Sequence, residues 1–320
     1  MSRFLPLWIR RQFAWRVSWR CRRAISLLAL VSAAAPAQQG QGPGGTRSPA
    51  GQPQLQVIQP IKPGLYLVIG AGANSVVRVT NDGIVVVNTK NLGEANYNAL
   101  MAQIRTVSDK PVKFAVVGDV HQDKSGNTAR FVEAGAQVIA HENEEKGLGT
   151  YINAAGTPGP PNVTYRGDYS IRSGNMEVAH VYHFGRASTG GDSITYFRDL
   201  KVVVMGDVFQ NGMNCDYAQG GSMLAWPKTL DAILALDFDT AIPNRGNPAT
   251  RADLEAARKR LMTISARAVD LVRKGTPKDQ LVARINAVDA SLQVNAFLMN
   301  NQARLDAFYD EASKAAKKAR

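Results

Sequence analysis

The segment at residues 116–127, with the sequence VVGDVHQDKSGN, limits the structure of this chain more than any other. It begins as an apolar strand, continues into a turn that holds Asp119, His121 and Asp123, and ends in small residues typical of a helix start. Carboxylate and imidazole groups are side chains that bind transition metals in proteins. The segment therefore predicts a candidate metal site at the end of a strand.

Short β-branched runs and helical segments alternate through residues 55–249. Strands are predicted at 64–69, 75–80, 83–88, 113–117, 137–140, 163–165, 176–182, 193–197, 201–205 and 240–242. Helices are predicted at 94–107, 125–134 and 226–236. This mixture, in two similar halves, predicts an α/β (α+β) fold in which two sheets pack face to face with helices outside, a four-layer αββα sandwich.

Residues 250–320 have a helical pattern throughout and form a C-terminal helical extension. Three helices are predicted, at 251–274, 277–288 and 295–318, and Gly275-Thr276-Pro277 separates the first from the second. We expect this extension to pack on the domain formed by residues 55–249.

The first 37 residues are typical of a secretory signal peptide. They contain seven arginines and no acidic residue, then an apolar stretch at 24–35 and a cleavage-type sequence, Ala35-Pro36-Ala37. Residues 38–54 are rich in Gln, Gly, Pro, Ser and Thr, which predicts a disordered linker. We therefore expect an exported protein, periplasmic or secreted.

The formal net charge of +12 includes those seven arginines, which leaves +5 for the rest of the chain. Such a charge is well short of the basic surface of a nucleic-acid-binding protein. The chain has no run of 18 or more apolar residues, so no membrane span is expected. Cys215 is the only cysteine beyond the signal segment, so the fold depends on its apolar core and not on an internal disulfide.

Five landmarks between about residues 55 and 262 have the order and spacing found in the metallo-β-lactamase superfamily, which this chain resembles. They are Gly83-Ile-Val-Val-Val-Asn88-Thr89, Asp119 to Lys124, His183-Phe-Gly-Arg-Ala-Ser188-Thr-Gly-Gly-Asp192, Met205-Gly206-Asp207 and Ile242-Pro243-Asn244-Arg245-Gly246. Within the superfamily the chain looks most similar to exported bacterial proteins. The resemblance implies the αββα sandwich, and it aligns the second landmark with the H-x-H-x-D-H zinc signature.

The resemblance also shows how much of the zinc site differs. The superfamily residue is kept at three of the seven ligand positions, His121, Asp123 and Asp207. The four remaining positions, all histidines in the superfamily, hold Asp119, Lys124, Ser188 and Arg245. A structural aspartate at the end of the third strand is replaced as well, by Asn88.

These replacements affect the two zinc ions unequally. By the resemblance, one ion would keep a weakened set, Asp119, His121 and Ser188. The other ion would face Asp123, Lys124 and Arg245, and charged ammonium and guanidinium groups have no lone pair to donate. We interpret Lys124 and Arg245 as fixed cations that replace the second ion electrostatically, because three buried carboxylates without partners would be costly.

The leading hypothesis is therefore a pseudoenzyme without a cofactor, or a binding protein that uses the old cleft. Its ligand would be a small polar or anionic molecule held by Lys124 and Arg245. A second hypothesis is a mononuclear hydrolase of ester, amide or lactam bonds. In that case Asp119, His121 and Asp207 would hold one Zn, Mn or Fe ion, and Asp123 would orient the attacking water. A third hypothesis is a structural or partner-binding protein that acts through its C-terminal helices.

Overall fold

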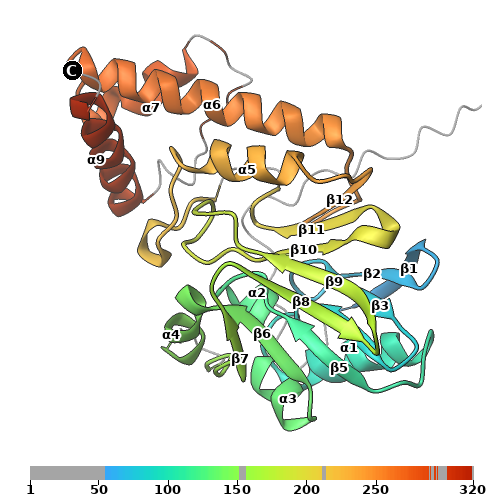
Figure 1. The fold of residues 1–320 in the computed structure, drawn as a ribbon. Helices are drawn as coiled ribbons and strands as arrows, with labels where there is room; N and C mark the ends of the chain where they lie inside the picture. The colour runs from blue at the N-terminus through green and yellow to red at the C-terminus, as the bar shows by residue number, and fades with distance from the viewer. Residues whose placement is uncertain are drawn as a thin grey trace, which may run out of the picture. The chain divides into compact units, whose positions relative to one another are not determined.

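The computed structural model describes residues 55–150, 156–210, 214–287, 289, 292, 294 and 301–318 (Figure 1). The described residues all belong to one compact unit. The predicted signal peptide at 1–37 and the predicted linker at 38–54 lie outside the described residues. So does part of the third predicted C-terminal helix, at 295–300.

The first sheet has seven strands in the order β1-β2-β3-β4-β5-β6-β7. They are β1 Val57–Lys62, β2 Leu65–Ile69, β3 Ser75–Val79, β4 Ile84–Val87, β5 Val112–Val116, β6 Gln137–His141 and β7 Val163–Tyr165. Strands β1 to β4 pair antiparallel, whereas β4 to β7 pair parallel. The carboxyl ends of β4, β5 and β6 therefore lie at one edge of the sheet.

The second sheet has five strands in the order β12-β11-β10-β9-β8. They are β8 Asp168–Ser173, β9 Met176–Tyr182, β10 Ile194–Phe197, β11 Val202–Gly206 and β12 Thr240–Pro243. Strands β11 and β12 pair parallel, so their carboxyl ends also lie together, and the remaining pairs are antiparallel.

The two sheets pack face to face through an apolar layer. Alternate residues of each strand enter this layer, for example Val85 and Val87 of β4 and Val202 and Val204 of β11. The intervening residues of β4 point to the opposite face, where Val86 packs with helical residues. Burial on both faces explains why these strands read as continuous β-branched runs in the sequence.

Helices cover the outer face of each sheet (Figure 1). On the seven-stranded sheet they are α1 Glu94–Arg105, α2 Gln122–Ser125, α3 Thr128–Glu133 and α4 Glu142–Thr150. On the other side they are α5 Trp226–Leu234, α6 Arg251–Arg273, α7 Lys278–Asn286 and α9 Gln302–Lys318. The predicted four-layer αββα architecture with a C-terminal helical extension is thus confirmed.

The C-terminal helices share their core with the five-stranded sheet. Leu261 of α6 and Phe308 of α9 belong to the same apolar cluster as Tyr196 and Met205 of the sheet. Helix α6 begins with a capping box in which Thr250 and Asp253 each accept a hydrogen bond from the backbone of the other. The domain boundary between residues 249 and 250 stays a prediction. Among the described residues, no helix is long and apolar enough to cross a bilayer.

The helices that follow β5 and β6 differ from the predictions. The helix expected at 125–134 spans only 128–133 (α3), and a separate short helix, α2, precedes it. Between them the Asn127 amide donates to the backbone carbonyls of Thr89 and Asn91. Helix α4 was not predicted, because Gly147 and Gly149 lower its helix propensity. A Cβ atom at Gly147 would lie 2.6 Å from the Val120 side chain, so a larger residue here would force that side chain to move.

Candidate functional site

The candidate site lies where the carboxyl ends of β4, β5, β11 and β12 meet. Asn88 follows β4, Asp119 and His121 follow β5, Asp207 follows β11 and Arg245 follows β12. Strands β4, β11 and β12 are buried on both faces over most of their length, and β5 is buried at its carboxyl end, so the backbone fixes where these polar residues begin. Such strand ends are where ligand sites form in α/β sheets.

Asn88 shapes the backbone beneath the site. Its φ is +66°, in the left-handed region that asparagine tolerates better than most residues. Its Oδ1 accepts from the Gly118 N–H at 3.2 Å, and its Nδ2 donates to the Asn74 carbonyl at 2.9 Å. A Cβ at Gly118 would lie 2.7 Å from Asn88 Oδ1, so this approach requires glycine. An aspartate could not make both bonds, because an ionised carboxylate only accepts.

Lys124 lies at the centre of three carboxylates, and its side chain is 0% exposed. Its Nζ lies 2.7 Å from Asp207 Oδ2, 2.9 Å from Asp123 Oδ1 and 3.3 Å from Asp119 Oδ2. Burial disfavours the charged amine, but the three negative charges outweigh burial and hold the pKa of Lys124 well above its usual value. The group is therefore an ammonium ion at neutral pH.

Arg245 closes the outer side of this network. Its Nη2 lies 2.8 Å from Asp123 Oδ2, and its Nη1 donates to the Gly72 carbonyl at 2.5 Å. Asn244 Nδ2 lies 3.4 Å from the same Asp123 oxygen. Burial raises the pKa of Asp123, yet the charges of Lys124 and Arg245 more than offset this effect and lower it. The Arg245 side chain is 59% exposed, so it is the cation of the pair that faces solvent.

His121 has a carboxylate on each side of its ring. Its Nδ1 lies 2.9 Å from Asp119 Oδ1, and its Nε2 lies 3.1 Å from Asp216 Oδ2. Because ionised carboxylates only accept, both ring nitrogens must carry protons to make these bonds. Burial lowers the pKa of His121, but its bonds to Asp119 and Asp216 outweigh burial and raise it well above the usual value. The ring is an imidazolium in this arrangement.

The pKa values of the other two buried carboxylates, Asp119 and Asp207, shift in opposite directions. Burial raises the pKa of Asp119, but the neighbouring charges of Lys124 and His121 lower it to about 2. The pKa of Asp207 is raised, because burial outweighs its 2.7 Å contact with Lys124. Asp207 Oδ1 is also buried without a hydrogen-bond partner. Lys124 is the neighbour that most favours the ionised form of Asp207.

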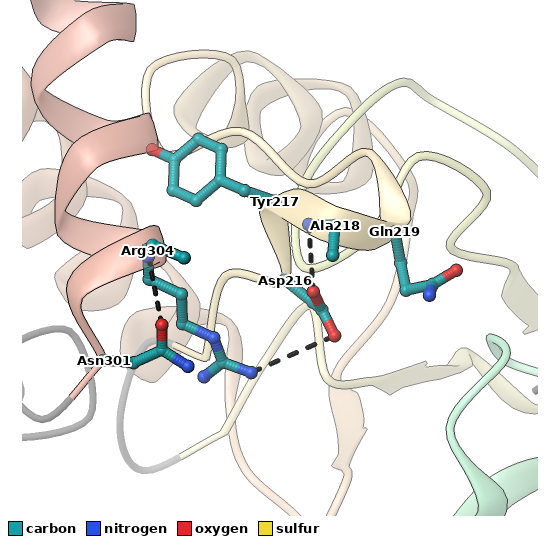
Figure 2. Close-up of a pocket in the computed structure, with 7 residues that line it drawn as sticks. Asp216, Tyr217, Ala218, Gln219, Asn301 and Arg304 are labelled. Carbon is teal, nitrogen blue, oxygen red and sulfur yellow. Dashed lines mark hydrogen bonds and ion pairs between the residues drawn. The ribbon is translucent and has the colours of Figure 1, made fainter. Parts of the chain in front are cut away.

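Asp216 links the network to the C-terminal helix α9 (Figure 2). Its Oδ1 accepts from the Ala218 N–H at 3.1 Å, and its Oδ2 lies 3.9 Å from Arg304 Nη2. Arg304 Nη1 also donates to Asn214 Oδ1 at 3.2 Å. The site thus contains four carboxylates, those of Asp119, Asp123, Asp207 and Asp216. Four cationic groups balance them, those of His121, Lys124, Arg245 and Arg304.

Three of these residues have ligand atoms close enough to share one metal ion. In the described part of the chain, this group is Asp119, His121 and Asp207, with one ligand atom of each within 4.8 Å of the others. It is the same set that the sequence predicts for a mononuclear site.

Comparison with solved structures places this arrangement on a known fold. A metallo-β-lactamase from Pontibacter korlensis has a TM-score of 0.55 and 20% identity, over 65% of this chain and 99% of that chain. The DIM-1 metallo-β-lactamase gives 0.56 and 15% over 65% and 97% of the two chains. The mono-zinc form of FIM-1 from Pseudomonas aeruginosa gives 0.55 and 16% over 66% and 96%.

The chain has the metallo-β-lactamase fold. No family model and no curated protein matches the sequence, so the likeness rests on structure. At 14–20% identity it concerns the fold alone.

On this metallo-β-lactamase fold, the residues predicted from sequence do not all meet. Asp119, His121, Asp123, Lys124, Asp207 and Arg245 form one connected network. Ser188 is fully buried and donates instead to the Asn214 carbonyl at 2.8 Å. Its backbone carbonyl accepts from the Asp216 N–H at 2.8 Å. Ser188 therefore positions the loop that carries Asp216.

Sequence reasoning missed Asp216 and Arg304. Asp216 lies in the loop between β11 and α5, where no periodic pattern marks it. Arg304 lies in a predicted helix, where a lone arginine normally faces solvent. Two further buried acids lie beside the site, and only the second of them belongs to a landmark of the sequence. They are Glu144, whose Oε1 accepts from Thr189 Oγ1 at 2.8 Å, and Asp192, whose Oδ2 accepts from the Thr189 N–H at 2.8 Å.

Proposed function

We propose that this chain is a non-hydrolytic protein of metallo-β-lactamase fold in which buried ion pairs replace the dinuclear metal centre. It would bind a small polar molecule in the remaining cleft. The observation that carries the proposal is the position of Lys124, whose Nζ lies 2.7–3.3 Å from three carboxylates with no solvent exposure. A permanent cation there neutralises the charge that a metal ion would otherwise neutralise.

The residues at the second zinc position support the loss of that ion. That ion would have to bind at Asp123, Lys124 and Arg245, and two of these three residues carry cations without a lone pair. Both cations already bond to Asp123, at 2.9 Å and 2.8 Å. A dication placed among them would meet like charges at close range. These residues do not fit a zinc ion.

The other ion position is weakened for a different reason. Its superfamily ligands correspond to Asp119, His121 and Ser188, and Ser188 bonds to the loop after β11 instead. Both nitrogens of His121 bond to carboxylates, whereas a metal ligand must offer an unprotonated nitrogen. A metal would therefore have to displace a proton and break a buried ion pair.

The burial of Lys124 also changes which group would hold a ligand. With its ammonium enclosed by carboxylates, Lys124 does not reach a molecule in the cleft. Arg245 is the exposed cation at this edge, with its fork directed at Asp123 and the Gly72 carbonyl. Arg245 is thus the anchor that we propose for an anionic group of the ligand.

A mononuclear metal-dependent hydrolase is the second candidate, favoured by the grouping of Asp119, His121 and Asp207 within 4.8 Å. When bound, a divalent ion would polarise a water molecule and the carbonyl of an ester, amide or lactam. Asp123 would then accept a proton at a carboxylate oxygen. Loss of the Lys124 and His121 ion pairs would be required first.

The response of thermal unfolding separates the two candidates. We expect the unfolding temperature to be unchanged by Zn²⁺, Mn²⁺ or Fe²⁺ and to rise with a small anion such as acetate or phosphate. Arg245→Gln should remove the anion effect, and Arg172→Gln on strand β8 is the matched control. A rise with metal but not with anions would instead support the hydrolase.

Export is a separate part of the proposal. It rests on the arginine-rich and apolar pattern of residues 1–37, which the structure does not describe. The mass of the protein recovered after expression in a Gram-negative bacterium tests it. We expect a mature chain that begins at Gln38, and a cytoplasmic full-length chain would contradict export.

A further inference from the structure

A cavity of about 310 Å³ lies beside the ion-pair network, between the loop after β11 and the start of α9 (Figure 2). The loop contributes Asp216 and Gln219, and the helix contributes Asn301 and Arg304. A volume of this size is at the lower end for pockets that bind small molecules. The walls of the cavity thus come from both the β-sandwich and the C-terminal extension.

The cavity has one charge of each sign on opposite walls. Figure 2 shows Arg304 extending from α9 toward Asp216 on the loop. Their nearest atoms are 3.9 Å apart, which is longer than a hydrogen bond. The Arg304 side chain is 18% exposed and the Asp216 side chain 13%, so water only partly screens the pair. This pair is therefore a long contact between two charged walls, and each side chain has a further partner, His121 for Asp216 and Asn214 for Arg304.

The charges of the cavity discriminate between classes of ligand. A simple anion near Arg304 would also approach the Asp216 carboxylate, and a simple cation near Asp216 would approach the guanidinium. A molecule with an ammonium and a carboxylate group can satisfy both walls and replace one long contact by two close ones. The carboxamides of Gln219 and Asn301 add donors and acceptors for further polar groups.

We propose that this cavity binds a small zwitterion, with its ammonium on Asp216 and its carboxylate on Arg304. This inference rests on the proposed binding function. It assigns that function a class of ligand, and it adds the Arg304 side of the cavity to the binding site. It assigns the C-terminal extension a direct part in binding. Because Asp216 also contacts His121 at 3.1 Å, the bound molecule would lie against the edge of the ion-pair network.

The test is a calorimetric titration of the full chain with ω-amino acids of increasing length, from glycine to 6-aminohexanoate. Acetate and methylammonium are the single-charge probes. We expect one chain length to bind at least about tenfold more tightly than either single-charge probe, since two charge-assisted bonds act together. Arg304→Gln and Asp216→Asn should each weaken that binding by about tenfold or more.

Two further variants separate binding from folding. Arg304→Lys keeps the charge but loses the planar fork, so we expect intermediate affinity with unchanged unfolding temperature. Arg267→Gln, on α6 and outside the cavity, should bind as the wild type does. Equal affinity for zwitterions and acetate, or binding unaffected by Arg304→Gln, would overturn the zwitterion site and leave the proposed function standing. The proposed function is overturned by a different measurement, a tightly bound metal in the purified chain, so the two failures can be told apart.

Discussion

Lys124 is the residue on which the proposed network depends most. We expect Lys124→Met to lower the free energy of unfolding by about 3–5 kcal/mol, because Asp119, Asp123 and Asp207 lose their shared buried cation. Urea unfolding at pH 7 measures this loss. Adding Asp207→Asn to the same chain should recover part of it, since one buried charge is then removed.

Arg245 provides the matched comparison, because it also pairs with Asp123 but is 59% exposed. Arg245→Gln should cost no more than about 1 kcal/mol, as expected of an ion pair that water screens. Equal costs for the two variants would show that Lys124 is no more important than a surface lysine.

Glu144 predicts a dependence of stability on pH. Burial, with a smaller effect from the Asp119 charge, raises its pKa from 4.5 to about 7. The folded chain therefore binds more protons than the unfolded chain between these values. Stability from this group is fully present below pH 4.5 and is lost as pH rises through 7, by roughly 3 kcal/mol at most.

Glu144→Gln should remove this slope, because glutamine mimics the protonated acid at every pH. Urea unfolding between pH 4.5 and 8 measures the slope in both proteins. Glu145→Gln, at the exposed neighbouring position, is the control and should retain the wild-type slope. An unchanged slope in Glu144→Gln would contradict the assignment of a buried, protonated Glu144.

At the scale of elements, helix α9 fixes the loop that carries Asp216. The Glu311 carboxylate accepts from the Tyr217 hydroxyl at 2.7 Å, from the Ser222 hydroxyl and from the Leu224 N–H at 3.4 Å. One side chain on the helix thereby holds three points of the loop. These bonds hold Tyr217, Ser222 and Leu224 against the helix beside the site.

Glu311→Ala should loosen that loop specifically. We expect a loss of roughly 2–3 kcal/mol in unfolding free energy, because bonds to a charged acceptor are lost together. Hydrogen exchange at residues 214–224 should become faster, while the β-sheet core stays protected. Asp310→Ala, which removes an exposed acid from the same helix, is the control. Equal exchange in both variants would contradict a positioning role for α9.

Sequence patterns predicted most elements, for reasons the structure makes clear. Strands such as β4 and β11 are buried on both faces, so their valine runs predict a buried strand. The break at Gly275-Thr276-Pro277 predicted the end of α6, and the capping box at Thr250 is a finding of the structure. Strand β8 was missed, since its residues, from Asp168 to Ser173, are mostly polar and partly exposed. It pairs with β9 across the two-residue turn Gly174-Asn175, a hairpin signal that the prediction did not use.

At the scale of the whole molecule, the site was only half predictable. Spacing along one chain located Asp119, His121 and Lys124, because one turn carries all three. Asp216 and Arg304 are 88 residues apart in sequence and meet only through packing of α9 against the loop. The sequence could show that four histidine positions differ from the superfamily. It could not show that α9 contributes a fourth cation to the charge balance.

Restoring the histidines tests whether the ancestral type of centre has been lost by substitution. We expect the combined variant Asp119→His, Lys124→His, Ser188→His and Arg245→His to bind zinc, since it regains neutral imidazole donors. Zinc titration followed by calorimetry measures the uptake, and circular dichroism checks the fold. Absence of uptake by the folded variant would mean that the backbone, and not the side chains, prevents binding.

The most direct test of the account is the metal content of the full chain, purified without chelator and measured by mass spectrometry of the elements. The ion pairs of Lys124 and His121 predict far less than one equivalent of any transition metal. One equivalent of metal per chain, lost in His121→Ala or Asp207→Ala, would contradict the replacement of the metal by ion pairs.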